Sequence, residues 1–317
     1  MAHWLVTGGA GFIGSRIVHT LISMGEKVRV LDNFFAGKKE FLDGIINKIE
    51  LIEGDIRDIH AVAKSVQGVD YVLHQAALRS VPRSVEQPYE YNSVNVDGTL
   101  NCLIASAENK VKRFVFASSS SVYGDTKKFP QEESDPTDPI SPYAVSKLAG
   151  EYYIRMFAKT YGLPGICLRY FNVFGPKQDP KSKYAAVIPK FIIAAIQGKS
   201  IEVHWDGQQA RDFTHIDNVV QANIVAAQSK KSESGIYNVG CGNSISLLQI
   251  VEGLEKILGK KLPKEFFPKR DGDVRKTYAS IAALQKDFNY TPKVTFETGL
   301  KDTFQYFFDK DRWKEYL

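Results

Sequence analysis

The sequence predicts an α/β fold, a doubly wound parallel sheet with a smaller α/β lobe formed by the C-terminal part of the chain. Two observations support this prediction. Short apolar runs alternate with helical patterns as far as Tyr170, and a glycine-rich turn directly follows the first apolar run. Strands that alternate with helices make right-handed crossovers, which bring the strands into one parallel sheet.

The expected strands of the first half follow one another along the chain. They are Trp4–Val6, Lys27–Leu31, Leu51–Ile52, Tyr71–Leu73, Arg113–Ala117 and Gly165–Arg169. The segment 172–212 is richer in Lys, Pro, Gln and Asp, which predicts loop and short helix, whereas 217–228 has helical apolar spacing. We expect one domain from 1–171 plus about 213–236, and a second from 172–212 plus about 237–317.

The composition is that of an ordinary globular protein. The 317 residues are 44% hydrophobic and 24% charged, and 41 Lys and Arg against 36 Asp and Glu give a net charge of +5. The basic residues are scattered, which argues against a nucleic-acid partner. No apolar run approaches the ~18 residues of a membrane span. Three cysteines without metal-ligand spacing predict no metal site, and with no signal-peptide pattern they favour the cytoplasm.

The glycine-rich turn links the first strand to the first helix. Gly8, Gly11 and Gly14 allow a tight turn, close approach to a pyrophosphate and close packing of the helix. Asp32 ends the second strand, where its carboxylate would bond ribose hydroxyls and repel a 2′-phosphate, which favours NAD over NADP. Asp32 could instead be a turn residue, and Asp55 either meets the adenine edge or caps a loop.

Tyr143 and Lys147 lie four residues apart on a predicted helix that starts with a Ser141 cap and Pro142. A free tyrosine has a pKa of ~10, and a nearby ammonium and a positively charged nicotinamide would both lower it. The pair could then take a hydroxyl proton while hydride leaves the same carbon.

Four consecutive serines, 118–121, end the fifth expected strand. A serine at the carboxyl end of such a strand can bond the reacting hydroxyl. One serine suffices for this role, and the others could satisfy backbone groups.

Together these features resemble the extended short-chain dehydrogenase/reductase family, and within it the nucleotide-sugar 4-epimerases. The resemblance covers nearly the whole chain and also rests on the segments 74–77, 95–99, 169–175 and 211–213. It implies a Rossmann-type domain with tightly held NAD and a UDP-sugar substrate that is transiently oxidised at C4. Tyr143 would take the proton of the 4-hydroxyl, hydride would pass to NAD, and the keto sugar would turn over before hydride returns. Lys147 would hold the nicotinamide ribose, and Ser119 matches the catalytic Ser or Thr.

The remaining site residues are those that match the motifs of this family. The cofactor-binding set is Gly8, Gly11, Phe12, Ile13, Gly14, Asp32, Asn33, Asp55, Ile56, Gln75, Ala76, Ala77, Asn95, Tyr143, Lys147 and Tyr170. The substrate-binding set is Arg79, Ser80, Arg83, Ser119, Ser120, Asn172, Ala186, Val187, Arg211, Arg270, Asp273 and Thr277. Relatives are commonly homodimers joined through paired helices, which here would start near Val94 and at Pro142.

The resemblance also bears on the reaction and the sugar. Related dehydratases and decarboxylases carry carboxylates where this chain has Ser120 and Ser121, so simple epimerisation is expected. Thr277 stands where glucose/galactose-restricted enzymes place a bulky tyrosine, and the segments 80–84 and 183–190 resemble bacterial UDP-N-acetylglucosamine 4-epimerases of surface-polysaccharide pathways. The expected reaction therefore interconverts UDP-N-acetylglucosamine and UDP-N-acetylgalactosamine.

Several alternatives stay open. Tyr278 could refill the space beside Thr277, and a UDP-glucose/UDP-galactose 4-epimerase would result. Arg79 either narrows the pocket or, with Arg83, pairs with the carboxylate of a UDP-glucuronic acid substrate. Arg83 could also be a surface residue. Outside the epimerases, the chain could be a net nucleotide-sugar oxidoreductase or a non-catalytic NAD-binding regulator.

Overall fold

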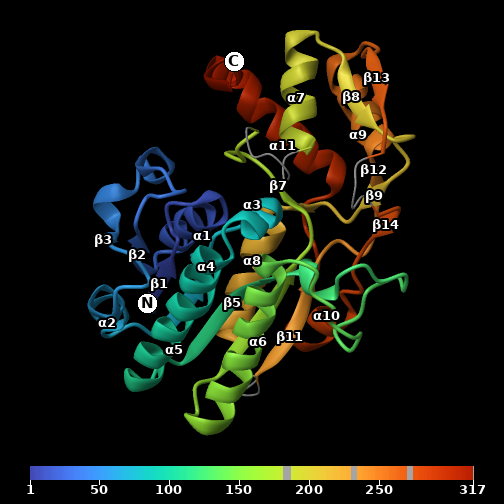
Figure 1. The fold of residues 1–317 in the computed structure, drawn as a ribbon. Coiled ribbons are helices and arrows are strands. Elements are labelled where there is room, and N and C mark those ends of the chain that lie inside the picture. Colours follow the sequence, from blue (N-terminus) through green and yellow to red (C-terminus); the bar gives the residue numbers. More distant parts are fainter. Residues whose placement is uncertain (181–186, 230–233, 270–273, 317) are drawn as a thin grey trace.

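The computed structural model describes residues 1–180, 187–229, 234–269 and 274–316 (Figure 1). Within these residues a seven-stranded sheet has the order β11-β6-β5-β4-β1-β2-β3, and each neighbouring pair is parallel. The predicted doubly wound parallel sheet is confirmed. The strands are β1 (His3–Thr7), β2 (Lys27–Asp32), β3 (Glu50–Glu53), β4 (Tyr71–His74), β5 (Arg113–Ser119), β6 (Gly165–Tyr170) and β11 (Gly235–Val239).

Different helices cover the two faces of this sheet. Alternate strand residues point to opposite faces, so Val6 packs with α1 (Phe12–Ser23) and α8 (Ile216–Gln228), whereas Leu5 packs on the other face. That other face is covered by α2 (Ile59–Val66), α5 (Gly98–Glu108) and α6 (Pro142–Thr160). Near-continuous burial of the strands follows from this double covering. The short helices α3 (Val81–Glu86) and α4 (Pro88–Asn92) and a π-helical turn, Ser93–Asp97, lead into α5.

A second lobe lies beyond the carboxyl ends of the strands (Figure 1). Its core joins α7 (Val187–Gln197), α9 (Leu247–Leu258) and α11 (Phe296–Phe308) to the parallel pair β8 (Ile201–His204) and β13 (Lys264–Phe267). Smaller pairings join β7 (Val173–Phe174) to β10 (Thr214–His215), and β9 (Ala210–Arg211) to β12 (Ile245–Ser246) and β14 (Lys276–Thr277). The segment 172–212 is thus more regular than loop and short helix, because α7 buries Ile188, Phe191 and Ile192 on one face.

The chain passes repeatedly between the two lobes. After the second-lobe strands β8 and β9, α8 returns to the sheet, and β11 pairs with β6 at its edge. Further on, α10 (Ala282–Phe288) packs against β11, with Tyr237 and Phe288 in edge-to-face contact. The sheet therefore continues to Val239, three residues past the expected division near 236, and the domain boundaries stay a prediction.

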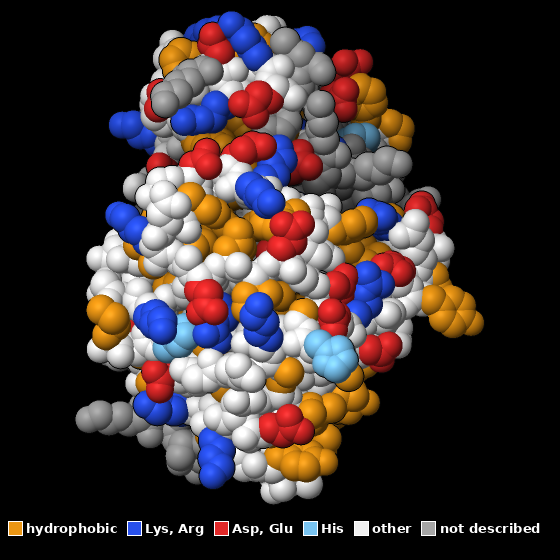
Figure 2. Space-filling view, turned by 90° about the vertical axis from the view of Figure 1, so that its left-hand side faces the viewer, with side chains coloured by type: hydrophobic (Ala, Val, Ile, Leu, Met, Phe, Trp, Pro, Cys, Tyr) orange, Lys and Arg blue, Asp and Glu red, His pale blue; other side chains and the backbone are white. Residues whose placement is uncertain are grey.

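The visible surface of the molecule carries mixed charge. In Figure 2, Lys and Arg side chains are interspersed with Asp and Glu over both lobes on the face shown. Within the described residues, no helix is both long enough and apolar enough to span a membrane.

Candidate active site

The turn between β1 and α1 forms a cradle of bare backbone. Gly8 has a φ of +66°, and a Cβ there would lie 2.8 Å from the Cα of Ala76. A Cβ on Gly14 would lie 2.1 Å from the Gly8 carbonyl oxygen. Gly11 is the N-cap of α1 and has no side chain to cap the first-turn amides, which leaves them open to an anion. These residues fit the pyrophosphate of NAD.

Two carboxylates lie at the neighbouring ends of β2 and β3. Asp32 accepts the backbone N–H groups of Ala10 and Phe34, each at 2.8 Å, and burial raises its pKa. Each of its oxygens retains a free lone pair that a ribose hydroxyl could use. Asp55 pairs with Arg57 and accepts from Asn33, and the Arg57 contact lowers the pKa of Asp55 to about 2.

The loop after β4 is held by side chains from other elements. Asn95 accepts from the N–H of Leu78 at 2.8 Å and donates to its carbonyl at 3.0 Å. The amide of Gln75 donates to Asn223 of α8, and the Tyr170 hydroxyl lies within hydrogen-bond distance of both. Asn223 was not among the predicted site residues, since only the fold brings α8 over the end of β4.

A buried histidine connects this loop to the glycine turn. His74 Nδ1 lies 2.8 Å from Thr7 Oγ1, and Nε2 lies 3.0 Å from Thr99 Oγ1. Thr99 donates its own proton to the Asn95 carbonyl at 2.6 Å, so His74 is the donor at Nε2 and the acceptor at Nδ1. Burial lowers the pKa of His74 to about 3, so the ring is neutral. Among the described residues, no group of His, Cys, Asp and Glu could hold a metal ion.

The helix α6 presents Tyr143 and Lys147 to the end of β5. As predicted, Ser141 caps this helix at the N–H of Ala144, and Pro142 is its first residue. Lys147 is 4% exposed, and its Nζ donates to the Ala117 carbonyl at 2.8 Å. Burial lowers the pKa of Lys147 to about 7.

The pKa of Tyr143 is set by opposing influences. This pKa lies above the ordinary value, because burial raises it by more than the Ser119 side chain and the charge of Arg79 lower it. The sequence predicted that Lys147 would also lower this pKa, and in this structure Lys147 Nζ donates one of its hydrogen bonds to the Ala117 carbonyl. Serine, tyrosine and lysine nevertheless meet at the carboxyl edge of the sheet, where a base with a hydrogen-bond donor beside it can take a hydroxyl proton.

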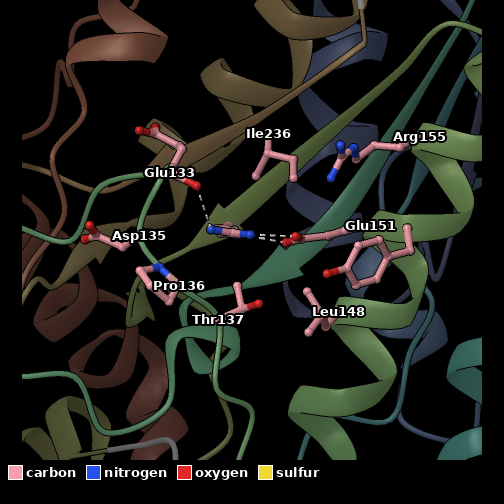
Figure 3. A pocket seen from close by; sticks show the side chains of 10 residues that line it. Glu133, Asp135, Pro136, Thr137, Leu148, Glu151, Arg155 and Ile236 are labelled. Carbon is pink, nitrogen blue, oxygen red and sulfur yellow. Dashed lines mark hydrogen bonds and ion pairs between the residues drawn. The ribbon is translucent and has the colours of Figure 1, made fainter.

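The first of the four serines, Ser118, belongs to a buried polar cluster. Ser118 points to the α6 side, where its hydroxyl donates to Glu151 at 2.5 Å. Glu151, four residues beyond Lys147, also holds the guanidinium of Arg169 from β6. Figure 3 shows Glu151 reaching from α6 into this cluster, beside a cavity of about 210 Å³. The residues that line this cavity include none of the predicted site residues.

The predicted substrate residues differ in their surroundings. Arg79 is exposed, and within the described ranges it has no hydrogen-bond or ion-pair partner. The Arg83 guanidinium lies 5.4 Å from the ring centre of Phe35, which follows β2, and its Nε donates to Gln87. Arg211 and Thr277 are register partners on β9 and β14. Ala186, Arg270 and Asp273 lie outside the described residues.

The other predicted substrate residues have mostly backbone roles here. Ser80 caps α3 by accepting from the N–H of Arg83, and the Asn172 carbonyl accepts from the N–H of Thr214. Val187 begins α7, and Ser120 begins the 3₁₀ turn after β5.

Sequence reasoning missed one buried carboxylate next to Arg211. Asp212 is fully buried and accepts the backbone N–H groups of Cys241, Gly242 and Ala279. Burial raises its pKa to about 6. The motif 211–213 was noted, but only its arginine was assigned a role.

Comparison with known proteins identifies the family of this chain. Residues 4–240 match the family described as NAD dependent epimerase/dehydratase. The chain belongs to this family. A UDP-N-acetylglucosamine 4-epimerase from Methanobrevibacter ruminantium M1, solved with UDP-N-acetylmuramic acid, has 40% identity and a TM-score of 0.93, covering 98% of this chain and 99% of that one. The family confirms the predicted class of NAD-dependent nucleotide-sugar epimerase and NAD as its cofactor.

Two further relatives differ in the sugar that their names give. The UDP-glucose 4-epimerase of Thermus thermophilus, solved with NAD, has 35% identity and a TM-score of 0.87, covering 97% of this chain and 99% of that one. A UDP-glucuronate 4-epimerase of Thermodesulfobacterium geofontis is 35% identical over 96% of this chain and 95% of its own length.

Proposed function

We propose that this protein is a UDP-hexose 4-epimerase that interconverts UDP-N-acetylglucosamine and UDP-N-acetylgalactosamine. The observation that carries the proposal is that Ser119 at the end of β5 and Tyr143 and Lys147 of α6 come together at the carboxyl edge of the sheet, where the Ser119 side chain lowers the pKa of the Tyr143 phenol and Lys147 donates to the Ala117 carbonyl. This arrangement supports removal and return of the proton on a sugar hydroxyl.

The side chains would divide the work as follows. Bound NAD supplies the hydride acceptor and donor and a positive charge on its nicotinamide ring. Tyr143, as the phenolate, takes the proton of the 4-hydroxyl and later returns it. Ser119 donates a hydrogen bond to the reacting oxygen as it becomes a carbonyl, and Lys147 holds the nicotinamide ribose. Neither Ser120 nor Ser121 offers a carboxylate for elimination, which supports simple epimerisation.

The nucleotide and the acetyl group would be read in the second lobe. Arg211 and Thr277 lie side by side on β9 and β14, so an arginine that grips the diphosphate would stand next to the residue that limits the sugar pocket. The short side chain of Thr277 leaves room for an N-acetyl group. This chain is similar both to an epimerase named for an N-acetylated sugar and to one named for UDP-glucose. The substrate assignment therefore depends on Arg211 and Thr277.

A second candidate substrate is a UDP-uronic acid. Arg79 is exposed, has no partner among the described residues, and its charge acts on Tyr143. An unpaired guanidinium close to the reacting sugar favours a carboxylate. The similar UDP-glucuronate 4-epimerase supports this candidate.

One experiment separates these reactions. Purified protein without added NAD is mixed with UDP-N-acetylglucosamine, UDP-glucose or UDP-glucuronic acid, and proton NMR follows each tube. We expect galacto-configured signals with the acetylated sugar and none with Tyr143→Phe, which should still bind NAD. Turnover of UDP-glucose alone would contradict the acetylated substrate, and turnover of UDP-glucuronic acid alone would support the Arg79 candidate. A requirement for external NADH would favour a net nucleotide-sugar oxidoreductase. The absence of turnover in all tubes would favour a non-catalytic NAD-binding regulator.

We also propose that the protein is a homodimer. The outer faces of α5 and α6 expose Ile104, Val145, Tyr152 and Met156 at 43%, 52%, 57% and 38%. Val145, Tyr152 and Met156 form one stripe on α6, which suits pairing with a second copy. Light scattering should give twice the chain mass for the wild type and a lower mass for Met156→Glu, and a monomeric wild type would contradict the proposal.

We place the reaction in the cytoplasm, as part of surface-polysaccharide synthesis. Cys102, Cys167 and Cys241 are free thiols, which suits a reducing compartment.

A further inference from the structure

The direction of the Ser119 hydroxyl is set by its second neighbour along the chain. Ser119 Oγ accepts the backbone N–H of Ser121 at 3.2 Å and the Ser121 hydroxyl at 2.9 Å. A serine hydroxyl has two acceptor lone pairs and one proton. With both lone pairs occupied, Ser119 can make its third hydrogen bond only as a donor. The phenol of Tyr143 is near enough for the Ser119 side chain to lower its pKa.

We propose that Ser121 is a positioning residue that holds the Ser119 hydroxyl as a donor, toward Tyr143 before substrate binds and toward the reacting sugar oxygen when substrate is bound. The proposal rests on the proposed role of Tyr143 as the base. A donor to the phenolate favours the charged form, so Ser121 lowers the pKa of the base through Ser119. The same donor would stabilise the oxygen that carries charge during hydride transfer.

The turn that carries Ser121 is well anchored. Ser121 belongs to the 3₁₀ turn Ser120–Tyr123, whose end is closed by the Gly124 N–H on the Ser121 carbonyl. Tyr123 is 1% exposed, donates to Asn238 at 2.7 Å, and has the Arg169 guanidinium 4.6 Å from its ring centre. The anchored backbone keeps the Ser121 hydroxyl within reach of Ser119.

This role also accounts for the chemistry of the position. Relatives that eliminate or decarboxylate are expected to carry a carboxylate at 120 or 121, and an ionised carboxylate only accepts hydrogen bonds. A carboxylate at 121 would accept the hydrogen bond of the Ser119 hydroxyl. The Ser119 O–H would then point away from Tyr143. A hydroxyl at 121 can instead donate to Ser119 Oγ, which leaves the Ser119 O–H able to donate to Tyr143.

The test is Ser121→Ala in the purified holoenzyme. We expect kcat to fall by about tenfold with little change in KM, as for the loss of one hydrogen bond that matters at the transition state. The acid limb of the kcat/KM profile should move to higher pH, because the base becomes harder to ionise. Ser121→Thr keeps the hydroxyl and should restore both. If the alanine variant does not fold, Ser121→Cys, whose thiol is a weak donor, should show the same shift.

A matched control is Ser65→Ala. Ser65 is fully buried, and its hydroxyl donates to the Ala61 carbonyl far from the serine run. This variant loses a buried serine hydroxyl and should keep the wild-type pH profile. NAD content, read from absorbance, should be equal in all the variants.

The outcomes discriminate between the two proposals. An inactive Tyr143→Phe together with a Ser121→Ala variant of wild-type pH profile would overturn only the role of Ser121. A slower Ser121→Ala that Thr does not rescue, or whose acid limb stays in place, would overturn it too. An active Tyr143→Phe would overturn the base and, with it, the role of Ser121.

Discussion

Glu151 of α6 and Arg169 of β6 form a two-point ion pair inside the protein. Arg169 Nε lies 2.9 Å from Oε1, and Nη2 lies 2.7 Å from Oε2. Their side chains are 2% and 3% exposed. The pair fastens the helix that carries Tyr143 to the sheet, and Ser118 joins it next to Ser119.

Replacing Glu151 by Gln should strongly destabilise the protein. The change keeps the shape but leaves the Arg169 charge buried without a counter-ion, which typically costs about 3–5 kcal/mol. The cavity beside the pair could admit water, so the lower end of this range is expected. Urea unfolding at equal NAD content measures the loss. Asp311→Asn, which breaks the exposed pair with Lys314, should leave the midpoint unchanged. A loss below about 1 kcal/mol for Glu151→Gln would show that the pair is not a main support.

Replacing Lys147 by Met should stabilise the cofactor-free protein at neutral pH while it abolishes turnover. Burial lowers the pKa of Lys147 from 10.5 to about 7, so between these values the unfolded chain binds the extra proton. Folding stability therefore rises with pH across this window, and the cost of burying the ammonium is greatest below pH 7. The gain in unfolding free energy for Lys147→Met should be larger at pH 7 than at pH 9. An equal gain at both pH values would contradict the lowered pKa.

Local signals predicted the parts of the site that lie close together in the chain. The Ser141 cap, the Pro142 start and the four-residue spacing of Tyr143 and Lys147 all depend on a single helix. The glycine turn needs only β1 and α1. The strands of the first half could be found because strands buried on both faces are continuously apolar.

The sequence could not predict which side chains meet when they are far apart in the chain. The sequence left Arg83 either as a partner of the sugar or as a surface residue, and it could not predict that the guanidinium lies over the ring of Phe35, 48 positions earlier in the chain. Asn223 reaches Gln75 only because α8 returns to the sheet. In both cases a partner distant in sequence decides the outcome. The helix α7 was expected only as short helix within 172–212, because the polar residues on either side of it weaken its apolar period.

Replacing Asp212 by Asn should weaken UDP-sugar binding without loss of NAD. The Asp212 carboxylate accepts three backbone N–H groups, and an amide nitrogen would face at least one of them as a second donor. The N–H of Asp212 also bonds the Thr277 carbonyl at 2.9 Å, so the strand pair that carries Arg211 should shift. We expect KM to rise severalfold and stability to fall by about 1–3 kcal/mol. Initial rates and bound NAD check this, and a change in NAD content with KM unaltered would contradict it.

The wild-type protein should also lose some stability as pH rises from about 4 to 6. The folded-state pKa of Asp212, about 6, lies above its ordinary 3.8, so the folded chain holds the extra proton in that window. Its contribution is greatest below pH 4 and is lost as pH passes 6. Denaturation curves at a series of pH values give the slope of stability against pH. This slope should differ between wild type and Asp212→Asn most between pH 4 and 6, and least at pH 7.

His74 should stay neutral in the folded protein at pH 5, where a free histidine is protonated. Its ring lies between Thr7 and Thr99, and protonation would turn Nδ1 from an acceptor into a second donor. Because the folded-state pKa is about 3 and the ordinary value is 6.5, the unfolded chain binds the extra proton between them. This group's contribution to stability is therefore complete above pH 6.5 and is lost as pH falls toward 3. Nitrogen NMR of the imidazole should report an Nε2–H tautomer at pH 5. A protonated His74 at that pH would disprove the hydrogen-bond chain that joins the glycine turn to Asn95.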